Sequence, residues 1–327
     1  MARILVIGGA GYIGSHVAKL LTSGKKKHEV LVFDDLSTGF RSLVRFGRLK
    51  KGSLGDAKAI AACVRDFKPA AILHFANFGQ VGESVADPGK YYRNNLGGTL
   101  NLLEAVRATK KKIPIVFSSS CAVYGEPNGP LDESHALAPV NPYGNCKKVA
   151  EEMLRDFESA YGIPSASLRY FNAAGADPEG EIGEMHEPES HLIPRLLKHS
   201  FGRQSKRDPV KILGDDYETP DGTCIRDYVH VMDLADAHVR AVDYLRDGGK
   251  SVALNLGSAH GYSVREIVRA VAEVSGKPLS VPVGPRRLGD PAQLVAVIER
   301  AKTLFGWAPT HNLESIVYSA WRWESAR

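Results

Sequence analysis

The chain contains little cysteine. Its 327 residues include only four, Cys63, Cys121, Cys146 and Cys224, and none of them forms a C-x-x-C pair or a metal-ligand spacing. This sparse pattern argues against a disulfide framework and against a cysteine-based metal site. We therefore expect a reduced, cytoplasmic protein that holds no metal.

Long apolar runs and a strong charge excess are also missing. No stretch approaches the ~18 apolar residues that a membrane-spanning helix needs, and the first apolar run, Ile4 to Ile7, is too short for a signal sequence. There are 42 basic and 37 acidic side chains, a net charge of +5. A basic run such as Lys110–Lys112 is typical of a solvated loop. We expect no membrane and no nucleic-acid partner.

The first residues carry the pattern of a dinucleotide-binding turn. The apolar run Ile4–Ile7 predicts a strand buried on both faces, and Gly8, Gly11 and Gly14 follow it at a spacing of three. These glycines permit a sharp turn, a close approach of backbone to a pyrophosphate, and close packing of the next helix against the strand. The N-terminus of that helix favours phosphate.

A second predicted strand, EVLVFDD, contains Asp34, twenty residues after Gly14. An acidic side chain at this place accepts hydrogen bonds from the adenosine ribose and repels a 2′-phosphate, which favours NAD over NADP. The alternative is a structural glycine turn in which Asp34 caps a loop.

Strands and helices continue to alternate along the chain. The segments 70–76 and 114–120 read as buried strands, and between them Leu100, Leu103 and Val106 recur at helical spacing. This order predicts an α/β fold with a doubly wound parallel sheet. Ligands bind such sheets beyond the carboxyl ends of the strands, so the motifs at these ends are expected to share one crevice.

The stretch NPYGNCK contains Tyr143 four residues before Lys147, after a helix-initiating Pro142. The two side chains are expected one turn apart on one helix face. A nearby ammonium and the positive nicotinamide of an oxidised cofactor favour the phenolate, which allows Tyr143 to act as a general base. Ser120, at the end of a strand, would align the substrate hydroxyl with Tyr143. Backbone capping is the alternative role of Ser120.

Longer motifs resemble those of the extended short-chain dehydrogenase/reductase family, and most closely its UDP-glucose (UDP-galactose) 4-epimerases. The resemblance runs nearly end to end. It is carried by GGAGYIGSH (8–16), HFANFGQVGESV (74–85), YYRNNLGGTL (91–100), SSSCAVYGEP (118–127), NPYGNCK (141–147), LRYFNAAGADP (168–178), DGTCIRDYVHVMDLADAHV (221–239) and PRRLGDP (285–291).

The resemblance implies an NAD cofactor, a UDP-sugar substrate and a homodimer. The implied reaction interconverts UDP-glucose and UDP-galactose through a 4-keto sugar, with Tyr143, Lys147 and Ser120 as catalytic residues. The implied cofactor-binding residues are Gly8, Gly11, Tyr12, Ile13, Gly14, Asp34, Asp35, Leu54, Phe75, Ala76, Asn77, Asn94, Ser118, Tyr143, Lys147 and Tyr170. The implied substrate-binding residues are Ser120, Tyr143, Asn172, His191, Leu192, Lys211, Ile212, Leu213, Arg226, Arg287, Asp290 and Leu294.

The same resemblance implies two domains and a dimer interface. Residues 1–175 are expected to form the NAD-binding domain, with segments near 227–257 returning to it, and residues 176–327 a smaller UDP-sugar-binding α/β domain. Helices that carry Tyr92, Leu96, Val149 and Met153 are expected either at the dimer interface or in the core.

Several positions depart from the family pattern. Ser53 replaces an aspartate near the adenine, Ala122 replaces a threonine near the sugar, and His191 replaces an asparagine. Leu294 stands at a gate for substituents at C2. Substrates such as UDP-N-acetylhexosamines or UDP-arabinose and UDP-xylose therefore remain open.

Two other classes of function were weighed. A 4,6-dehydratase needs an Asp-Glu pair after the active-site hydroxyl, where this chain has Cys121 and Ala122. A non-catalytic NAD-binding sensor predicts a broken Tyr, Lys and Ser set, and all three residues are present here.

Overall fold

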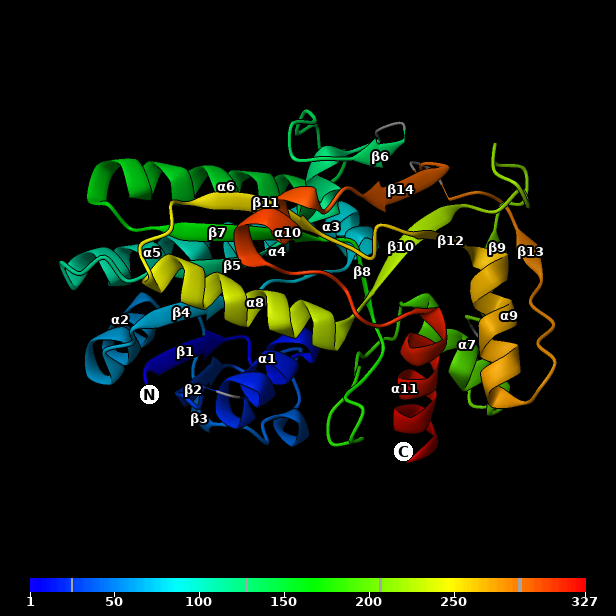
Figure 1. Ribbon diagram of the computed structural model, residues 1–327, viewed down its shortest axis with the longest axis horizontal. Coiled ribbons are helices and arrows are strands. Elements are labelled where there is room, and N and C mark those ends of the chain that lie inside the picture. Colours follow the sequence, from blue (N-terminus) through cyan, green and yellow to red (C-terminus); the bar gives the residue numbers. More distant parts are fainter. Residues whose placement is uncertain (25, 127–128, 206–207, 288–289) are drawn as a thin grey trace.

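The computed structural model describes residues 1–24, 26–126, 129–205, 208–287 and 290–327 (Figure 1). Pro127 of the SSSCAVYGEP motif and Leu288 and Gly289 of the PRRLGDP motif lie outside the described residues. Among the described residues, no helix is both long enough and apolar enough to cross a membrane.

A seven-stranded sheet forms the centre of the larger part of the molecule. Its order is β11-β7-β5-β4-β1-β2-β3, and every neighbouring pair is parallel. The strands are β1 (Arg3–Ile7), β2 (Glu29–Asp34), β3 (Arg48–Lys51), β4 (Ala71–His74), β5 (Ile115–Ser120), β7 (Ser165–Tyr170) and β11 (Val252–Leu256). The predicted doubly wound parallel sheet is confirmed.

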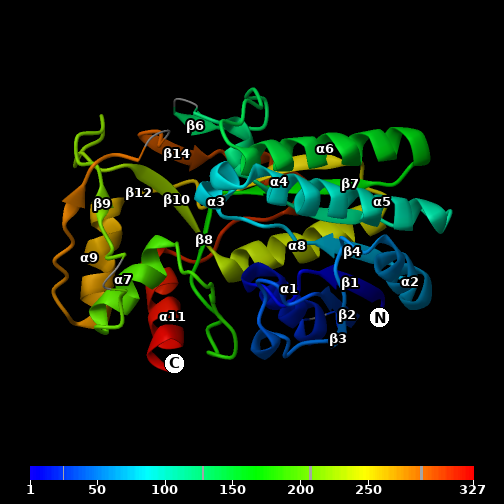
Figure 2. The ribbon, with the colours of Figure 1, turned by 180° about the vertical axis from the view of Figure 1, so that it is seen from behind.

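Helices cover both faces of this sheet (Figures 1 and 2). Successive side chains of a strand point to opposite faces, so Ile4 and Val6 of β1 pack with one group of helices while Leu5 and Ile7 pack with the other. The first group is α1 (Tyr12–Ser23), α8 (Val231–Arg246) and α10 (Glu299–Phe305). The second group is α2 (Ala57–Phe67), α5 (Gly98–Ala108) and α6 (Pro142–Tyr161). Burial on both faces explains the continuous apolar runs of β1, β2 and β4, whereas the edge strand β3, with the sequence RLKK, is partly exposed and mostly basic.

The predicted helix over 91–109 is interrupted. Two short helices, α3 (Val81–Ala86) and α4 (Pro88–Tyr91), lead into a π-helical segment, Tyr92–Gly97, before α5 begins. Leu103 and Val106 are fully buried, but Leu100 is 44% exposed. At about 100° per residue Leu100 lies about 120° around the helix from Val106, and it therefore misses the core face.

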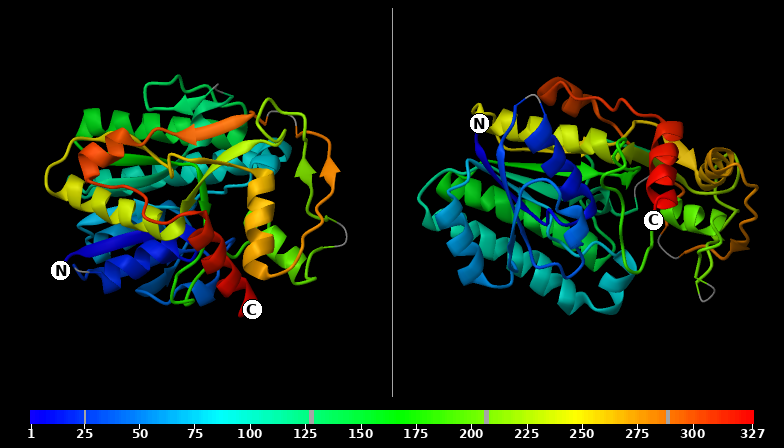
Figure 3. Two further views of the ribbon diagram at one scale, coloured as in Figure 1. Left: turned by 45° about the vertical axis from the view of Figure 1, so that its right-hand side comes forward. Right: turned by 90° about the horizontal axis from the view of Figure 1, so that it is seen from below.

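A smaller group of elements lies beyond one end of the sheet (Figure 3). Its helices α7 (Leu192–Ser200), α9 (Val264–Ser275) and α11 (Leu313–Ser325) share one apolar cluster. Its strands are β6 (Pro130–Leu131), β8 (Asn172–Ala174), β9 (Ile212–Leu213), β10 (Ile225–His230), β12 (Gly261–Ser263), β13 (Val283–Gly284) and β14 (Gln293–Ala296). Short 3-10 turns occur at Arg41–Leu43 and Cys121–Tyr124.

The division of the chain into two domains stays a prediction. Within the segment 227–257, α8 packs on the large sheet and β11 pairs with β7 at its edge. Strand β10 pairs instead with β8, β12 and β14 of the smaller group. The chain thus passes several times between the two groups of elements.

Candidate active site

A cavity of about 480 Å³ opens at the carboxyl ends of the central strands. All the cofactor-binding residues expected from the resemblance line it: Gly8, Gly11, Tyr12, Ile13, Gly14, Asp34, Asp35, Leu54, Phe75, Ala76, Asn77, Asn94, Ser118, Tyr143, Lys147 and Tyr170. Besides Tyr143, which belongs to both sets, five of the expected substrate residues line it: Ser120, Asn172, His191, Arg226 and Leu294. The fold therefore gathers these motifs from both groups of elements into one crevice.

The glycine turn leaves no room for side chains. Gly8 has a φ of +80°, and a Cβ there would lie 2.5 Å from the Ala76 nitrogen. A Cβ on Gly14 would lie 2.4 Å from the Gly8 carbonyl oxygen. Gly11 is the N-cap of α1 and offers no capping side chain. The first turn of α1 can therefore present N–H groups to a phosphate, and the turn fits a dinucleotide diphosphate.

Asp34 holds the glycine turn in place. One of its carboxylate oxygens accepts the Ala10 N–H at 2.9 Å and the other accepts the Leu36 N–H at 2.9 Å. Burial raises the pKa of this carboxyl group. Each oxygen keeps a further lone pair, so the side chain can still accept a ribose hydroxyl.

Ser53 also contributes to this corner of the cavity. Its hydroxyl hydrogen-bonds to Asp35, whose carboxylate also accepts the Ser37 N–H at 2.9 Å. The serine that departs from the family pattern therefore orients a cavity-lining acid.

Tyr143 and Lys147 lie one turn apart near the start of α6. The helix begins at Pro142, and the Asn141 side chain caps it by accepting the Gly144 N–H at 2.8 Å. The Ser120 hydroxyl lies close enough to Tyr143 to lower the pKa of the phenol. The predicted helix start and the predicted proximity of Tyr143 to Ser120 are both found in the structure.

The electrostatics of this pair differ from the prediction. Burial raises the pKa of Tyr143 to about 12, and the nearby Ser120 hydroxyl only partly opposes it. Burial also lowers the pKa of Lys147 to about 7. Desolvation disfavours both charged forms, so it outweighs the expected stabilisation of the phenolate by the ammonium.

The serines that end β5 have separate partners. Ser120 accepts the Ala122 N–H at 3.2 Å and so caps the 3-10 turn. Ser119 donates to Glu151, which is paired with Arg169 in the interior. Ser120 therefore has the capping role that the sequence left as the alternative, and its alignment of a substrate hydroxyl stays a prediction, whereas Ser119 belongs to a buried polar network.

Arg226 does not pair with its neighbour in sequence. The Asp227 carboxylate is buried and accepts backbone N–H groups of Ser258, Ala259 and Ala296. Arg226 lines the cavity instead, and its guanidinium donates to the carbonyl oxygen of Pro291 at 2.9 Å. Arg226 and Asp227, although adjacent in sequence, therefore do not form an ion pair with each other.

Two arginines meet at Asp290. The guanidinium of Arg287 donates to both carboxylate oxygens of Asp290, at 3.0 and 3.1 Å. Arg226 approaches the same carboxylate at 3.6 Å. Three expected substrate residues from β10 and from the segment before β14 thus converge at the cavity edge, where a guanidinium fork suits phosphate oxygens.

The remaining expected substrate residues lie outside the cavity wall. Leu192 begins α7 directly after His191, and Lys211 precedes the short strand of Ile212 and Leu213. None of them lines the cavity in the described part of the chain, and the same holds for Arg287 and Asp290. Their roles stay predictions.

Sequence reasoning missed several residues of the wall. They are Ser37, Thr38, Gly39, Phe78, Glu83, Cys121, Phe171, Met185, His186 and Ser190. Phe78, Cys121 and Phe171 directly follow the predicted site residues Asn77, Ser120 and Tyr170, and this adjacency is the signal that could have found them. His186 and Ser190 belong to the segment EMHEPESH, whose repeated glutamates and histidines were not interpreted.

Comparison with known proteins gives one consistent result. The profile of the NAD dependent epimerase/dehydratase family matches residues 4–257. A UDP-glucose 4-epimerase of Rhizobium meliloti (strain 1021) is 50% identical over 326 residues, which cover 99% of this chain and 98% of that protein.

Solved structures agree with this match. UDP-glucose 4-epimerase from Brucella ovis in complex with NAD superposes with a TM-score of 0.93 at 48% identity, covering 98% of both chains. The enzyme from Bifidobacterium longum in complex with NAD+ and UDP gives a TM-score of 0.91 at 34% identity and covers 99% of this chain and 98% of that one. The chain therefore belongs to the NAD dependent epimerase/dehydratase family.

Proposed function

We propose that this protein is a UDP-glucose 4-epimerase, which interconverts UDP-glucose and UDP-galactose by inverting C4 with NAD as cofactor. The observation that carries the proposal is Tyr143, beside Ser120 and one helical turn from Lys147, in the wall of a cavity that also contains the glycine turn. The full-length relatives named UDP-glucose 4-epimerase support it.

The residues around the cavity fit NAD. The glycine turn has room for a diphosphate only because its glycines carry no side chains. Asp34 and Asp35 line the part of the cavity where the adenosine ribose of the cofactor would lie. The side-chain amide of Asn77 is buried in the wall and has no hydrogen-bond partner among the described residues. When bound, NAD accepts the hydride from C4 and returns it.

Tyr143 is the group that moves the proton. Its hydroxyl would take the proton of the sugar 4-hydroxyl while Ser120 holds that hydroxyl in line, and later it would return a proton to the 4-keto sugar. Because Tyr143 is protonated in the ligand-free state, with a pKa of about 12, binding must supply the charge that lowers its pKa. A cationic nicotinamide next to the phenol provides such a charge.

Inversion at C4 requires tight binding of the nucleotide and weak binding of the sugar. Arg226, held against Pro291 and Asp290, offers a guanidinium to the substrate diphosphate at the cavity edge. On the sugar side, Ala122 and Leu294 are small or flexible apolar residues with no hydrogen-bonding side chain. A 4-keto sugar can turn about its diphosphate link in such a place and present its other face.

Purified protein incubated with UDP-galactose tests the proposal. Without added NAD, we expect UDP-glucose to accumulate until the two sugars reach equilibrium, because NAD stays bound and is regenerated in each cycle. NAD released on denaturation from a protein that converts no UDP-sugar would contradict the proposal and favour a non-catalytic sensor.

The assembly and setting of the protein are further parts of this proposal. Tyr92 and Leu100 are exposed on the π-helical segment and α5, and Val149 and Met153 are half-buried on the adjacent α6. This apolar strip supports a homodimer through these helices. The four free thiols support a cytoplasmic setting. Light scattering of the native protein and of Leu100→Glu tests the dimer, since a monomeric native protein would contradict it.

A further inference from the structure

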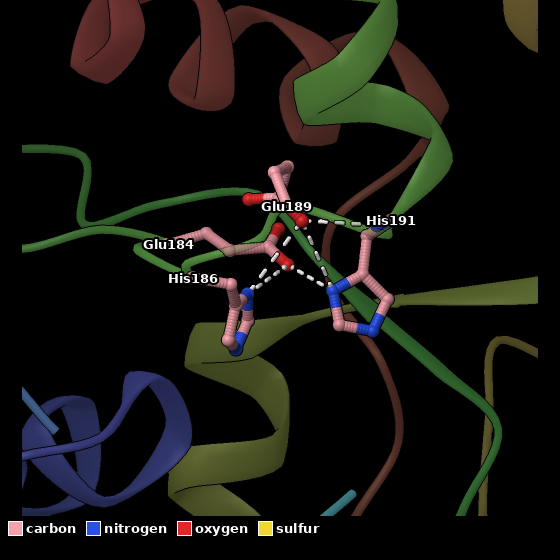
Figure 4. Close-up of side chains that lie close together, drawn as sticks. All are labelled: Glu184, His186, Glu189 and His191. Atoms are coloured by element: carbon pink, nitrogen blue, oxygen red, sulfur yellow. Dashed lines mark hydrogen bonds and ion pairs between the residues drawn. The ribbon is translucent and has the colours of Figure 1, made fainter. Parts of the chain in front are cut away.

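Two glutamates and two histidines converge in the loop between β8 and α7. They are Glu184, His186, Glu189 and His191 (Figure 4). The Glu184 Oε1 atom lies 3.2 Å from His186 Nδ1 and 2.6 Å from His191 Nδ1. The Glu189 Oε1 atom lies 3.7 and 3.6 Å from the same two nitrogens. All four side chains therefore turn one potential ligand atom toward a common point.

The spacing of these atoms matches a tetrahedral metal site. Zn²⁺ binds imidazole nitrogen and carboxylate oxygen at about 2.0–2.2 Å, which places neighbouring ligand atoms of a tetrahedron about 3.3–3.6 Å apart. The four nitrogen–oxygen separations, 2.6 to 3.7 Å, lie on both sides of this value. Small movements of the side chains would bring them to the ideal distance.

Two of these atoms, Glu184 Oε1 and His186 Nδ1, are buried and have no well-directed hydrogen bond among the described residues. Their near neighbours are the other members of the cluster, because Glu184 Oε1 is in ion-pair contact with both histidines, 3.2 Å from His186 Nδ1 and 2.6 Å from His191 Nδ1. The Glu184 side chain is only 6% exposed. Buried polar atoms are rarely left without partners. An ion at the common point would satisfy both atoms at once.

A second acidic cluster nearby provides a contrast. Asp177, Glu179 and Glu181 also lie close together, but the ammonium of Lys19 occupies the space between them, at 2.7, 2.6 and 2.8 Å from their oxygens. This lysine already supplies the positive charge. No lysine or arginine takes that place between Glu184 and Glu189 in the described part of the chain, where the partners are imidazoles.

We propose that Glu184, His186, Glu189 and His191 bind one divalent transition-metal ion, of which Zn²⁺ is the best fit. Imidazole and carboxylate ligands suit zinc, and four protein ligands make a closed, structural site rather than a catalytic one. The site goes beyond the proposed epimerase activity and does not depend on it.

The position of the site indicates a structural role for the metal. His186 and His191 line the cavity, and the His186 ring meets the edge of the Tyr12 ring next to the glycine turn, at 6.2 Å between centroids. His191 is also the residue before α7. A metal at this point would fix the loop 184–191 against the cavity wall and hold the start of α7 in place.

The competing explanation is a network of ion pairs without metal. The carboxylate of Glu184 raises the pKa of His191 to about 10 against the opposing effect of burial. Two imidazolium ions between two carboxylates would also be stable. The two explanations differ in metal content and in the spectrum of the bound ion, and these are the quantities to measure.

The first experiment uses the untagged full-length protein. After treatment with EDTA and dialysis, it is titrated with Zn²⁺ against a chromophoric chelator, and a second sample is loaded with Co²⁺. We expect about one equivalent of metal per chain and the intense visible absorption of tetrahedral cobalt. A folded protein that binds neither ion above background would overturn the proposal in favour of the ion-pair network.

Variants locate the site. Glu184→Gln keeps the size of the side chain but removes the charged ligand, and we expect at least a 100-fold loss of zinc affinity. Glu179→Gln, in the cluster that Lys19 occupies, is the matched control and is expected to bind zinc like the native protein. Equal affinity of the native protein and Glu184→Gln, both folded by circular dichroism, would overturn the assignment.

Discussion

The ammonium of Lys147 lies 5.7 Å from the centre of the Tyr143 ring, yet it donates its hydrogen bond to the Ser118 carbonyl oxygen at 2.5 Å. The lysine is therefore anchored to the end of β5 and not to the phenol. Both groups are desolvated, which lowers the pKa of Lys147 to about 7 and raises that of Tyr143 to about 12. At neutral pH Tyr143 is therefore protonated in the ligand-free site and Lys147 is only partly charged, so a bound cofactor must supply the positive charge that favours the phenolate.

Replacing Tyr143 with Phe removes the proposed base and leaves the ring in place. We expect kcat for UDP-galactose conversion to fall by about 10²–10⁴-fold, the usual contribution of a general acid–base group, while NAD remains bound. The measurements are turnover and the NAD released on denaturation. Turnover close to that of the native protein would show that another group carries the proton.

Lys147 makes the stability of the ligand-free protein depend on pH. Its pKa is about 7 in the folded chain and about 10.4 when unfolded, so the unfolded state binds more protons between these values. Within this window the native protein gains stability as pH rises, by up to about 1.4 kcal/mol per pH unit. Lys147→Met lacks this contribution.

Urea unfolding of the native protein and of Lys147→Met at about pH 7 and pH 9 measures this effect. We expect the free energy of unfolding of the native protein to increase relative to that of the variant at the higher pH. A difference between the two proteins that stays constant with pH would contradict the lowered pKa.

Arg226→Ala tests the binding of the substrate diphosphate. A charge-assisted hydrogen bond contributes about 1.5–3 kcal/mol, so we expect KM for the UDP-sugar to rise by about 10–100-fold. Arg240→Ala is a suitable control, because Arg240 is ion-paired with Asp236 on the surface of α8. An unchanged KM in Arg226→Ala would contradict a role of Arg226 in binding the diphosphate and would show that its contacts with Pro291 and Asp290 are structural.

Leu294→Tyr tests the gate at the sugar end of the cavity. Leu294 lines the cavity and is paired in register with Arg226 across β10 and β14. A larger side chain takes space beside C2, so we expect any activity on UDP-N-acetylhexosamines to fall more than activity on UDP-galactose. The measurement is the activity of the native protein and the variant on both substrates. Equal losses on the two substrates would contradict the role of Leu294 as a gate for substituents at C2.

Local patterns in the sequence determined the parallel sheet, the glycine turn and the placement of Tyr143 and Lys147 on one helix face. These features depend on short-range geometry: the continuous apolar runs of the strands, the conformational freedom of glycine and the helical repeat. The convergence of the motifs followed because the carboxyl ends of parallel strands lie at one edge.

Only the tertiary structure decided which distant groups meet and how strongly they are desolvated. Arg226 is separated from the adjacent Asp227 and brought to Asp290, because β10 turns Asp227 into the interior. The pKa values of Tyr143 and Lys147 are set by burial, which no local pattern encodes. The cluster of Glu184 and His191 likewise arises from the path of a loop that has no periodic pattern. Contacts between distant segments, and the loss of water that accompanies them, exist only once the chain is packed.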